Sequence, residues 1–159
     1  MPSPRDLLGC ATPGRTIPAA LLFSGGTTGI PKAVEHTHRR LAFSVRSMAK
    51  IFGPRTEGDV FLAIAPFSHM YGLLAGVLLP VYVRGETVIP ERFQPEHIVE
   101  LIMRHRVTIF GGGPPAIYTA VLAANNLHGA DLSSLRICPA GRCTVPGRTH
   151  GPLAARDGT

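Results

Sequence analysis

The residues best suited to chemistry in this 159-residue chain form a loop of small and hydroxyl-bearing side chains that ends in a lysine. The stretch reads LLFSGGTTGIPKAV over residues 21–34, and an apolar strand over Ala20 to Phe23 is predicted to lead into it. Glycines let backbone N–H groups approach an anion, hydroxyls donate further hydrogen bonds, and a lysine adds a positive point charge. The pattern therefore predicts a loop that binds phosphate.

This loop differs from the one in switch GTPases and kinase-like ATPases, which reads G-x-x-x-x-G-K-[ST] and opens a helix. Here Ile30 and Pro31 separate Gly29 from Lys32, and Ala33 stands where a Ser or Thr would hold magnesium. Residues 34–36 indicate an extended segment, so we expect a strand–loop–strand arrangement. A plain Gly/Ser/Thr linker is the alternative, but linkers have no fixed Pro-Lys ending.

The same stretch resembles the signature loop of the adenylate-forming enzymes, [ST]-[SG]-G-T-T-G-x-P-K-G, and the chain is most similar to the acyl-CoA synthetase (AMP-dependent synthetase-ligase) type. Ala33 replaces the final glycine, and Thr37-His38 follows at the distance usual in that superfamily. The resemblance implies that the phosphates of ATP are bound by Ser24, Gly25, Gly26, Thr27, Thr28, Gly29 and Lys32.

A second motif, APFSHMYGL over residues 65–73, follows a predicted buried strand. Ligands of α/β proteins bind at the carboxyl ends of strands. Acyl-CoA synthetases commonly carry P-x-x-H-x-x-G at this distance, and the resemblance implies that His69 lies beside the carboxylate that is activated. The alternative is that His69 is a histidine whose hydrogen bonds are satisfied at a helix N-terminus.

Two later segments resemble the same family: residues 92–122, and DLSSLR over residues 131–136. In the family the latter leads into a small-residue loop that packs against adenine, and Ala140 and Gly141 would be its remnant here. The pattern stops after Gly141. A one-nucleotide frame shift from that point would permit Gly-Ala-Ala-Pro-Phe-Pro, the missing loop, and the underlying DNA tests this hypothesis.

These observations divide the chain into three parts. Residues 1–17 are expected to be a short disordered lead, residues 18–141 a partial AMP-binding domain, and residues 142–159 a tail that is either frameshifted or disordered. Compared with the family, the 159 residues lack the magnesium-binding Glu, the ribose-binding Asp and the catalytic lysine. The chain alone is therefore expected to be inactive, as a fragment of the large N-terminal domain.

Composition excludes several other classes. The net charge is +6, but the basic residues are dispersed and aromatic residues do not alternate with them, so a nucleic-acid partner is not expected. Cys10, Cys138 and Cys143 lack zinc-ligand spacing and indicate reduced thiols in the cytoplasm, with no metal site of their own. Residues 60–83 are long enough to cross a bilayer, but Pro66 and His69 interrupt them, which favours a buried βα unit.

The periodicity predicts strands alternating with helices, which is typical of an α/β fold with a largely parallel sheet. Beyond the strand at Ala20–Phe23, the predicted strands are Val60–Ala65, Gly85–Pro90, Val107–Phe110 and Leu135–Cys138. The predicted helices are His38–Phe52 with Thr37 as N-cap, Tyr71–Tyr82, Pro95–His105 and Pro114–Asn125.

The function that the resemblance implies is ATP-dependent carboxylate–CoA ligation through an acyl-adenylate, with ATP, Mg²⁺ and coenzyme A as cofactors and substrates. The acid, the identity of the thiol acceptor and the oligomeric state stay open. Two alternatives remain: a non-catalytic module that binds ATP or phosphate, and a gene remnant without a stable fold.

Overall fold

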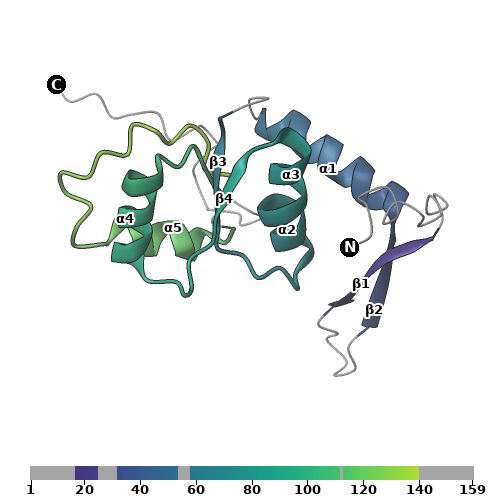
Figure 1. Cartoon of the computed structure of the whole chain (residues 1–159). Coiled ribbons are helices and arrows are strands. Elements are labelled where there is room, and N and C mark those ends of the chain that lie inside the picture. Colours follow the sequence, from purple (N-terminus) through teal and green to yellow (C-terminus); the bar gives the residue numbers. More distant parts are fainter. Residues whose placement is uncertain (1–16, 25–31, 54–57, 112, 140–159) are drawn as a thin grey trace, which may run out of the picture.

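The computed structural model of the chain describes residues 17–24, 32–53, 58–111 and 113–139. Its strands and helices alternate, which confirms the predicted α/β class (Figure 1). The strands are β1 (Pro18–Ser24), β2 (Lys32–Thr37), β3 (Val60–Ala63), β4 (Glu86–Val88) and β5 (Ile109–Gly111). The helices are α1 (His38–Phe52), α2 (Met70–Gly72), the π-helix η2 (Leu73–Leu78), α3 (Leu79–Val83), α4 (Pro95–His105) and α5 (Pro115–Leu122).

A parallel sheet with strand order β4-β3-β5 lies at the centre of the described chain. Strand β3 pairs with β4 on one side and with β5 on the other, and Ile137 adds a single parallel bridge to Ile109 beyond β5. The connections between the parallel strands carry the helices, as parallel pairing requires. The carboxyl ends of the strands therefore meet at one edge, where ligands bind in such sheets.

Helices cover both faces of this sheet (Figure 1). Neighbouring residues of a strand point to opposite faces, and the two cores follow this alternation. Phe61 and Ile109 are buried together with residues of α1, η2 and α3. Leu62 and Phe110 are buried with residues of α4 and α5. The strands thus read as continuous apolar runs because each face has its own helical layer.

Helices α1 and α4 have the predicted bounds because their signals are local. Thr37 accepts a hydrogen bond from the Arg40 N–H at the start of α1, and Pro95 stands in the first turn of α4. Gly53, with φ of 50°, ends α1 in the left-handed conformation that glycine adopts easily. The expected apolar stripe of α4, Ile98, Leu101 and Ile102, is buried.

The helix predicted over Tyr71–Tyr82 is observed as three consecutive helical segments, α2, η2 and α3, from Met70 to Val83. Leu79 donates its N–H to the Leu74 carbonyl, five residues back, which is the spacing of a π-helix. Pro80 follows directly and has no N–H to donate. We attribute the wider turn to this proline, because the hydrogen bond with the wider spacing is made by the residue just before it.

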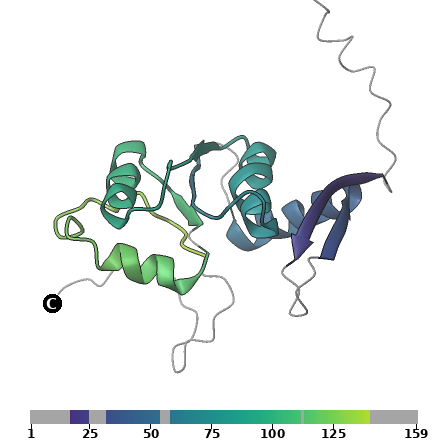
Figure 2. The same cartoon turned by 90° about the horizontal axis from the view of Figure 1, so that it is seen from below.

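The strands β1 and β2 form an antiparallel hairpin and, within the described chain, are in a sheet of their own. Figures 1 and 2 show this hairpin projecting beyond α1, away from the central sheet. Several of its apolar side chains are open to solvent, with Leu21 60% and Phe23 72% exposed. The expectation of a largely parallel sheet therefore holds for β3, β4 and β5, and the antiparallel hairpin is a separate sheet beside it within the described residues.

Several predicted bounds of strands differ from those in the structure. The strand expected over Gly85–Pro90 extends only over Glu86–Val88, and the one expected over Leu135–Cys138 is reduced to the bridge at Ile137. Pro90 and Pro139 lack the N–H that would extend these ladders. No helix among the described residues is long and apolar enough to span a bilayer, and residues 60–83 form β3, a turn and the α2–η2–α3 unit.

Candidate active site

The predicted phosphate loop connects the two strands of the hairpin. Ser24 and Lys32 are partners at the last register position of β1 and β2, so the backbone positions that bound the loop lie opposite each other. Residues 25–31, which include Gly25, Gly26, Thr27, Thr28 and Gly29, lie outside the described residues. The expected strand–loop–strand arrangement is observed in its two strands, and the phosphate contacts stay a prediction.

His69 lies at the carboxyl end of β3, in the turn before α2. The Tyr71 N–H donates a hydrogen bond of 3.1 Å to Nδ1 of His69, and the His69 N–H donates one of 3.0 Å to the Pro66 carbonyl. A nitrogen that accepts this bond carries no proton, so the neutral ring has its proton on Nε2. The imidazole is exposed. His69 thus caps a helix, as the alternative expected, and also presents an Nε2–H donor to solvent.

A close backbone contact fixes the turn that carries His69. Gly72 is buried, and a side chain there would collide with the carbonyl group of Pro66 and lie 2.7 Å from the Ala65 carbonyl oxygen. The first helical turn can pack on residues 65–66 only because position 72 has no Cβ. The glycine of the P-x-x-H-x-x-G pattern therefore has a steric explanation.

A small apolar pocket opens beside this turn, between the carboxyl ends of β3 and β5. Its lining includes Ala63, Ala65, Tyr71, Gly76 and Gly111. The Tyr71 hydroxyl is buried and has no hydrogen-bond partner among the described residues. Burial raises the pKa of Tyr71 above its ordinary value, so the hydroxyl stays protonated. A buried polar atom without a protein partner is unusual in a folded protein, and a water molecule or a ligand atom could bind here.

The predicted adenine side begins at the edge of the described chain. Ala140 and Gly141 lie outside the described residues, and the last described residue is Pro139. The segment before them lies along β5, because Ile137 bridges to Ile109 and accepts a hydrogen bond of 2.9 Å from the Phe110 N–H. The segment therefore ends at the same edge of the sheet as β3, and the turn with His69 follows β3 at that edge.

Sequence reasoning missed three side chains, two near this edge of the sheet and one, Asp59, at the opposite edge where β3 begins. Tyr71 stands two residues after His69, and Tyr118 and Asp59 were read only as parts of a helix and a turn. Tyr71 could have been noticed as an aromatic residue within the P-x-x-H-x-x-G pattern. Nothing local distinguishes Tyr118 or Asp59, whose partners are distant in the sequence.

No cluster of three His, Cys, Asp or Glu side chains suited to a metal ion occurs within residues 17–24, 32–53, 58–111 and 113–139. Cys138 has a free thiol, and burial raises its pKa to about 11. It is thus a neutral thiol at physiological pH and a poor nucleophile or metal ligand.

Comparison with known families gives the sequence pattern a definite assignment. The model of the family described as "AMP-binding enzyme" matches residues 9–150, which is most of the chain. The chain belongs to this family. Its fold is therefore that of the large N-terminal domain of adenylate-forming enzymes.

Individual relatives of this chain are ligases. It is 41% identical over 127 residues to the 3-[(3aS,4S,7aS)-7a-methyl-1,5-dioxo-octahydro-1H-inden-4-yl]propanoyl:CoA ligase of Mycobacterium tuberculosis, covering 79% of the chain and 24% of that protein. It is 34% identical to the long-chain-fatty-acid–CoA ligase of Bacillus subtilis, over 80% of the chain and 23% of that protein. The crystal structure of ATP-bound MatB from Rhodopseudomonas palustris is similar with a TM-score of 0.71 and 26% identity, over 81% of the chain and 25% of that structure. The chain thus spans about a quarter of the length of these relatives.

Proposed function

We propose that the chain is part of an AMP-forming ligase that activates a carboxylic acid with ATP and transfers the acyl group to the thiol of coenzyme A. The observation that carries the proposal is the arrangement at the carboxyl end of β3. There an exposed imidazole has Nδ1 occupied by the Tyr71 N–H, which leaves Nε2–H as a donor, and the neighbouring residues Ala65 and Tyr71 line a small apolar pocket. Such a donor suits a carboxylate. The pocket has room for about one water-sized group, so it could hold a single polar atom of the acid and not its apolar part.

The chemistry has two steps. A carboxylate oxygen attacks the α-phosphorus of ATP, the bond from that phosphorus to the bridging oxygen breaks, and pyrophosphate leaves. The sulfur of coenzyme A then attacks the acyl carbon, AMP leaves, and the thiol proton is released to solvent. The first step brings two anions together, so it depends on charge neutralisation and on orientation of the carboxylate.

The proposed roles follow from this requirement. Lys32, Ser24, Thr27, Thr28 and the loop glycines Gly25, Gly26 and Gly29 would neutralise and hold the phosphates of ATP. His69 would donate from Nε2 to the carboxylate and orient it. Tyr71, whose buried hydroxyl has no partner among the described residues, would meet a polar atom of the acid within the pocket. Ala140 and Gly141 would lie against adenine.

Magnesium would accompany ATP as its complex. We therefore assign no step to the metal. A reducing, cytoplasmic setting is part of the proposal. The acid is not specified by these residues, and the ligase relatives named above act on acids of very different shape.

We further propose that these 159 residues alone bind ATP weakly and do not catalyse its exchange with pyrophosphate. The support is that the chain spans a quarter of its relatives, and that the hairpin beside the phosphate loop exposes apolar side chains.

Calorimetric titration of the purified chain with ATP and magnesium tests the binding. Lys32→Ala should abolish the binding, whereas Lys50→Ala, which removes another exposed lysine, should leave it unchanged. Equal binding by all three proteins would contradict the assignment of the phosphate loop.

Carboxylate-dependent exchange of pyrophosphate into ATP tests the chemistry. Exchange by the chain above the level of its Lys32→Ala variant would show that the isolated chain is active and overturn that part of the proposal. ATP binding without exchange is the expected result. Exchange of pyrophosphate into ATP should then require the complete ligase, and in that protein Lys32→Ala and His69→Ala should both reduce the exchange rate.

A further inference from the structure

The segment Arg136–Pro139, which leads toward the predicted adenine side, is held in place with little backbone pairing. Its backbone bonds to β5 run from the Arg136 and Ile137 N–H groups to the Thr108 carbonyl, at 2.8 and 3.1 Å, and from the Phe110 N–H to Ile137. A single bridge residue does not make a ladder. The position of this segment therefore depends strongly on side-chain contacts.

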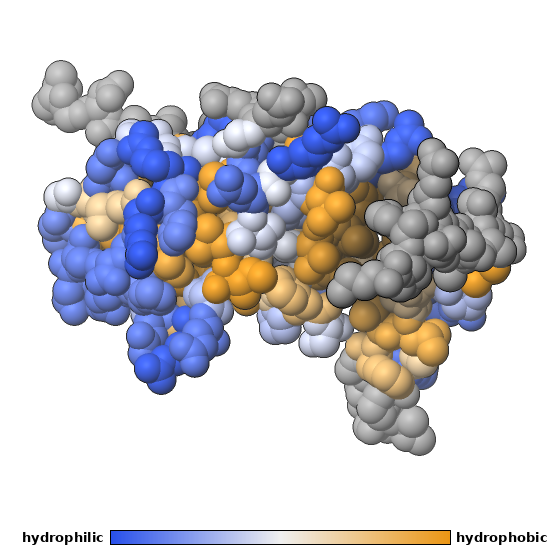
Figure 3. Space-filling model, viewed as in Figure 1, coloured by the Kyte–Doolittle hydropathy of each residue, from blue (hydrophilic) through white to orange (hydrophobic). Residues whose placement is uncertain are grey.

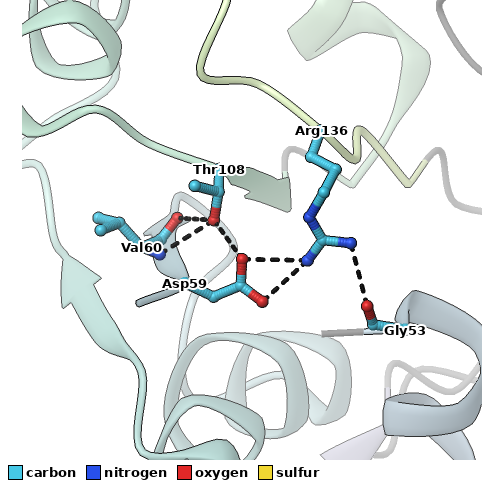
Figure 4. A network of polar contacts seen from close by, with 5 residues as sticks. All are labelled: Gly53, Asp59, Val60, Thr108 and Arg136. Atoms are coloured by element: carbon cyan, nitrogen blue, oxygen red, sulfur yellow. Dashed lines mark hydrogen bonds and ion pairs between the residues drawn. The ribbon is translucent and has the colours of Figure 1, made fainter. Parts of the chain in front are cut away.

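At the amino end of the segment, Arg136 is anchored by a buried carboxylate (Figure 4). Nη2 of Arg136 donates to both oxygens of Asp59, at 3.0 and 2.8 Å, and Nη1 donates to the Gly53 carbonyl at 3.0 Å. The Asp59 side chain is fully buried, and its Oδ1 also accepts the Thr108 hydroxyl at 2.8 Å. Removal of one partner of such a pair leaves an uncompensated buried charge.

This anchor joins the amino ends of all the parallel strands. The Thr108 hydroxyl oxygen accepts from the Val60 N–H at the start of β3, and the Asp59 carbonyl accepts from the Glu86 N–H at the start of β4. Thr108 itself precedes β5. Arg136 is thus tied to β3, β4 and β5 at once, and through Gly53 to the end of α1.

At the carboxyl end of the segment, Tyr118 of α5 forms the second anchor. Its hydroxyl lies 2.6 Å from the Pro139 carbonyl oxygen and 3.1 Å from the Phe110 carbonyl oxygen. Its ring packs edge-on against Phe110, with 5.1 Å between ring centroids. One hydroxyl therefore links β5 to the last described residue before Ala140.

We propose that Tyr118 and Arg136 are positioning residues for nucleotide binding: they fix both ends of residues 136–139 against β5, and so set where the chain enters Ala140 and Gly141. The inference rests on the proposed function for its ligand, because those two residues are assigned to adenine there. It concerns different side chains from the phosphate loop and from His69. It predicts that the anchors affect recognition of the base and not of the phosphates.

The thiol of Cys138 allows a test without nucleotide. In a background where Cys10 and Cys143 are replaced by serine, the rate of alkylation at pH 8 reports exposure of this segment. Tyr118→Phe keeps the ring against Phe110 and removes one hydroxyl, so we expect alkylation to be about fivefold faster, as for loss of one hydrogen bond. Arg136→Lys should give at least as large an increase, since lysine cannot make the forked contacts.

Two control variants separate local release from general destabilisation. Thr119→Val removes a hydroxyl from the same helix, one that bonds only within α5 in the described structure, and should leave the alkylation rate unchanged. Val45→Ala would leave a cavity in the other core cluster and should lower the melting temperature. If Val45→Ala accelerates alkylation as much as Tyr118→Phe does, labelling proceeds through global unfolding and the anchoring role is overturned.

Nucleotide binding then tests whether the anchors affect recognition of the base or of the phosphates. Tyr118→Phe should weaken binding of ATP about fivefold relative to the parent chain and leave binding of inorganic tripolyphosphate unchanged. An equal loss for both ligands would overturn the adenine-side role. If the parent chain binds neither ligand, the proposed binding of ATP by these 159 residues fails and the nucleotide role falls with it, while the alkylation rates still decide whether the two side chains hold the segment.

Discussion

The hairpin and the central sheet differ in how their apolar side chains are used. In the sheet, Phe61 and Leu62 point to opposite faces, and each is at most 2% exposed beneath a helical layer. In the hairpin, Leu21 and Phe23 also alternate with their neighbours, yet both are more than half exposed. Figure 3 shows the same contrast, with apolar side chains open on the hairpin at lower right and a mainly hydrophilic surface over α4 at left.

The contrast separates the two halves of the predicted site. The carboxylate side, with His69, stands on the packed sheet, whereas the phosphate loop is carried by two strands whose only sheet partners among the described residues are each other. A two-stranded hairpin alone is marginally stable in water. We therefore expect the carboxylate side to be preformed and the phosphate side to be ordered mainly by its ligand.

The largest expected effect compares one leucine from each region. Leu62→Ala removes a side chain that is 1% exposed in the sheet, and should lower the free energy of unfolding by about 3 kcal/mol. Leu21→Ala removes one that is mostly exposed in the hairpin, and should change it by less than about 0.5 kcal/mol. Urea titration followed by circular dichroism measures both. Similar losses for the two variants would show that the hairpin is part of the cooperative core.

A smaller effect is expected from glycine substitutions within the sheet half. Gly72→Ala places a methyl group against the Pro66 carbonyl and should cost about 2 kcal/mol, since the obstacle is backbone.

Gly111→Ala is the matched control for this change. Its Cβ would lie 3.7 Å from the Tyr71 hydroxyl oxygen, an ordinary contact, and stability should change little. Thermal unfolding decides the matter, and a Gly72→Ala variant as stable as Gly111→Ala would mean that the turn at His69 is not rigid.

A further effect, confined to alkaline pH, is expected at Cys138. Burial raises the pKa of this thiol to about 11 from an ordinary value near 9.0. Between these pH values the unfolded chain has lost a proton that the folded chain keeps, so stability falls as the pH rises through this window. The difference in unfolding free energy between the parent and Cys138→Ala, measured under reducing conditions at pH 8.5 and 10.5, isolates the contribution. A difference independent of pH would mean that residues 136–139 are more open than described.

The sequence predicted those features whose signals are local. The bounds of α1 and α4 follow from the amphipathic period, the Thr37 cap and the position of Pro95. The pairing of strands was harder to predict, because parallel partners are separated by whole helices. Nothing local indicates that β1 and β2 form a sheet separate from β3, β4 and β5.

The site divides in the same way. His69 was predicted from its motif, and its role stays a prediction. The Asp59–Arg136 pair joins residues 77 positions apart, and the contact from Tyr118 to Pro139 depends on how α5 lies on the sheet. A buried acid among turn residues looks, in sequence, like any solvated aspartate. The limits of the domain at residues 18 and 141 and the suggested frame shift stay predictions.

Hydrogen exchange measured by mass spectrometry, with and without millimolar ATP and magnesium, tests the central claim most directly. Without ligand, peptides from β1 and β2 should exchange quickly and those from β3 and β5 slowly. With ATP, exchange should slow in the hairpin and its loop, and Lys32→Ala should abolish this protection without changing the sheet. Absence of protection in the hairpin, or protection that persists in Lys32→Ala, would contradict the assignment of this loop to the phosphates of ATP.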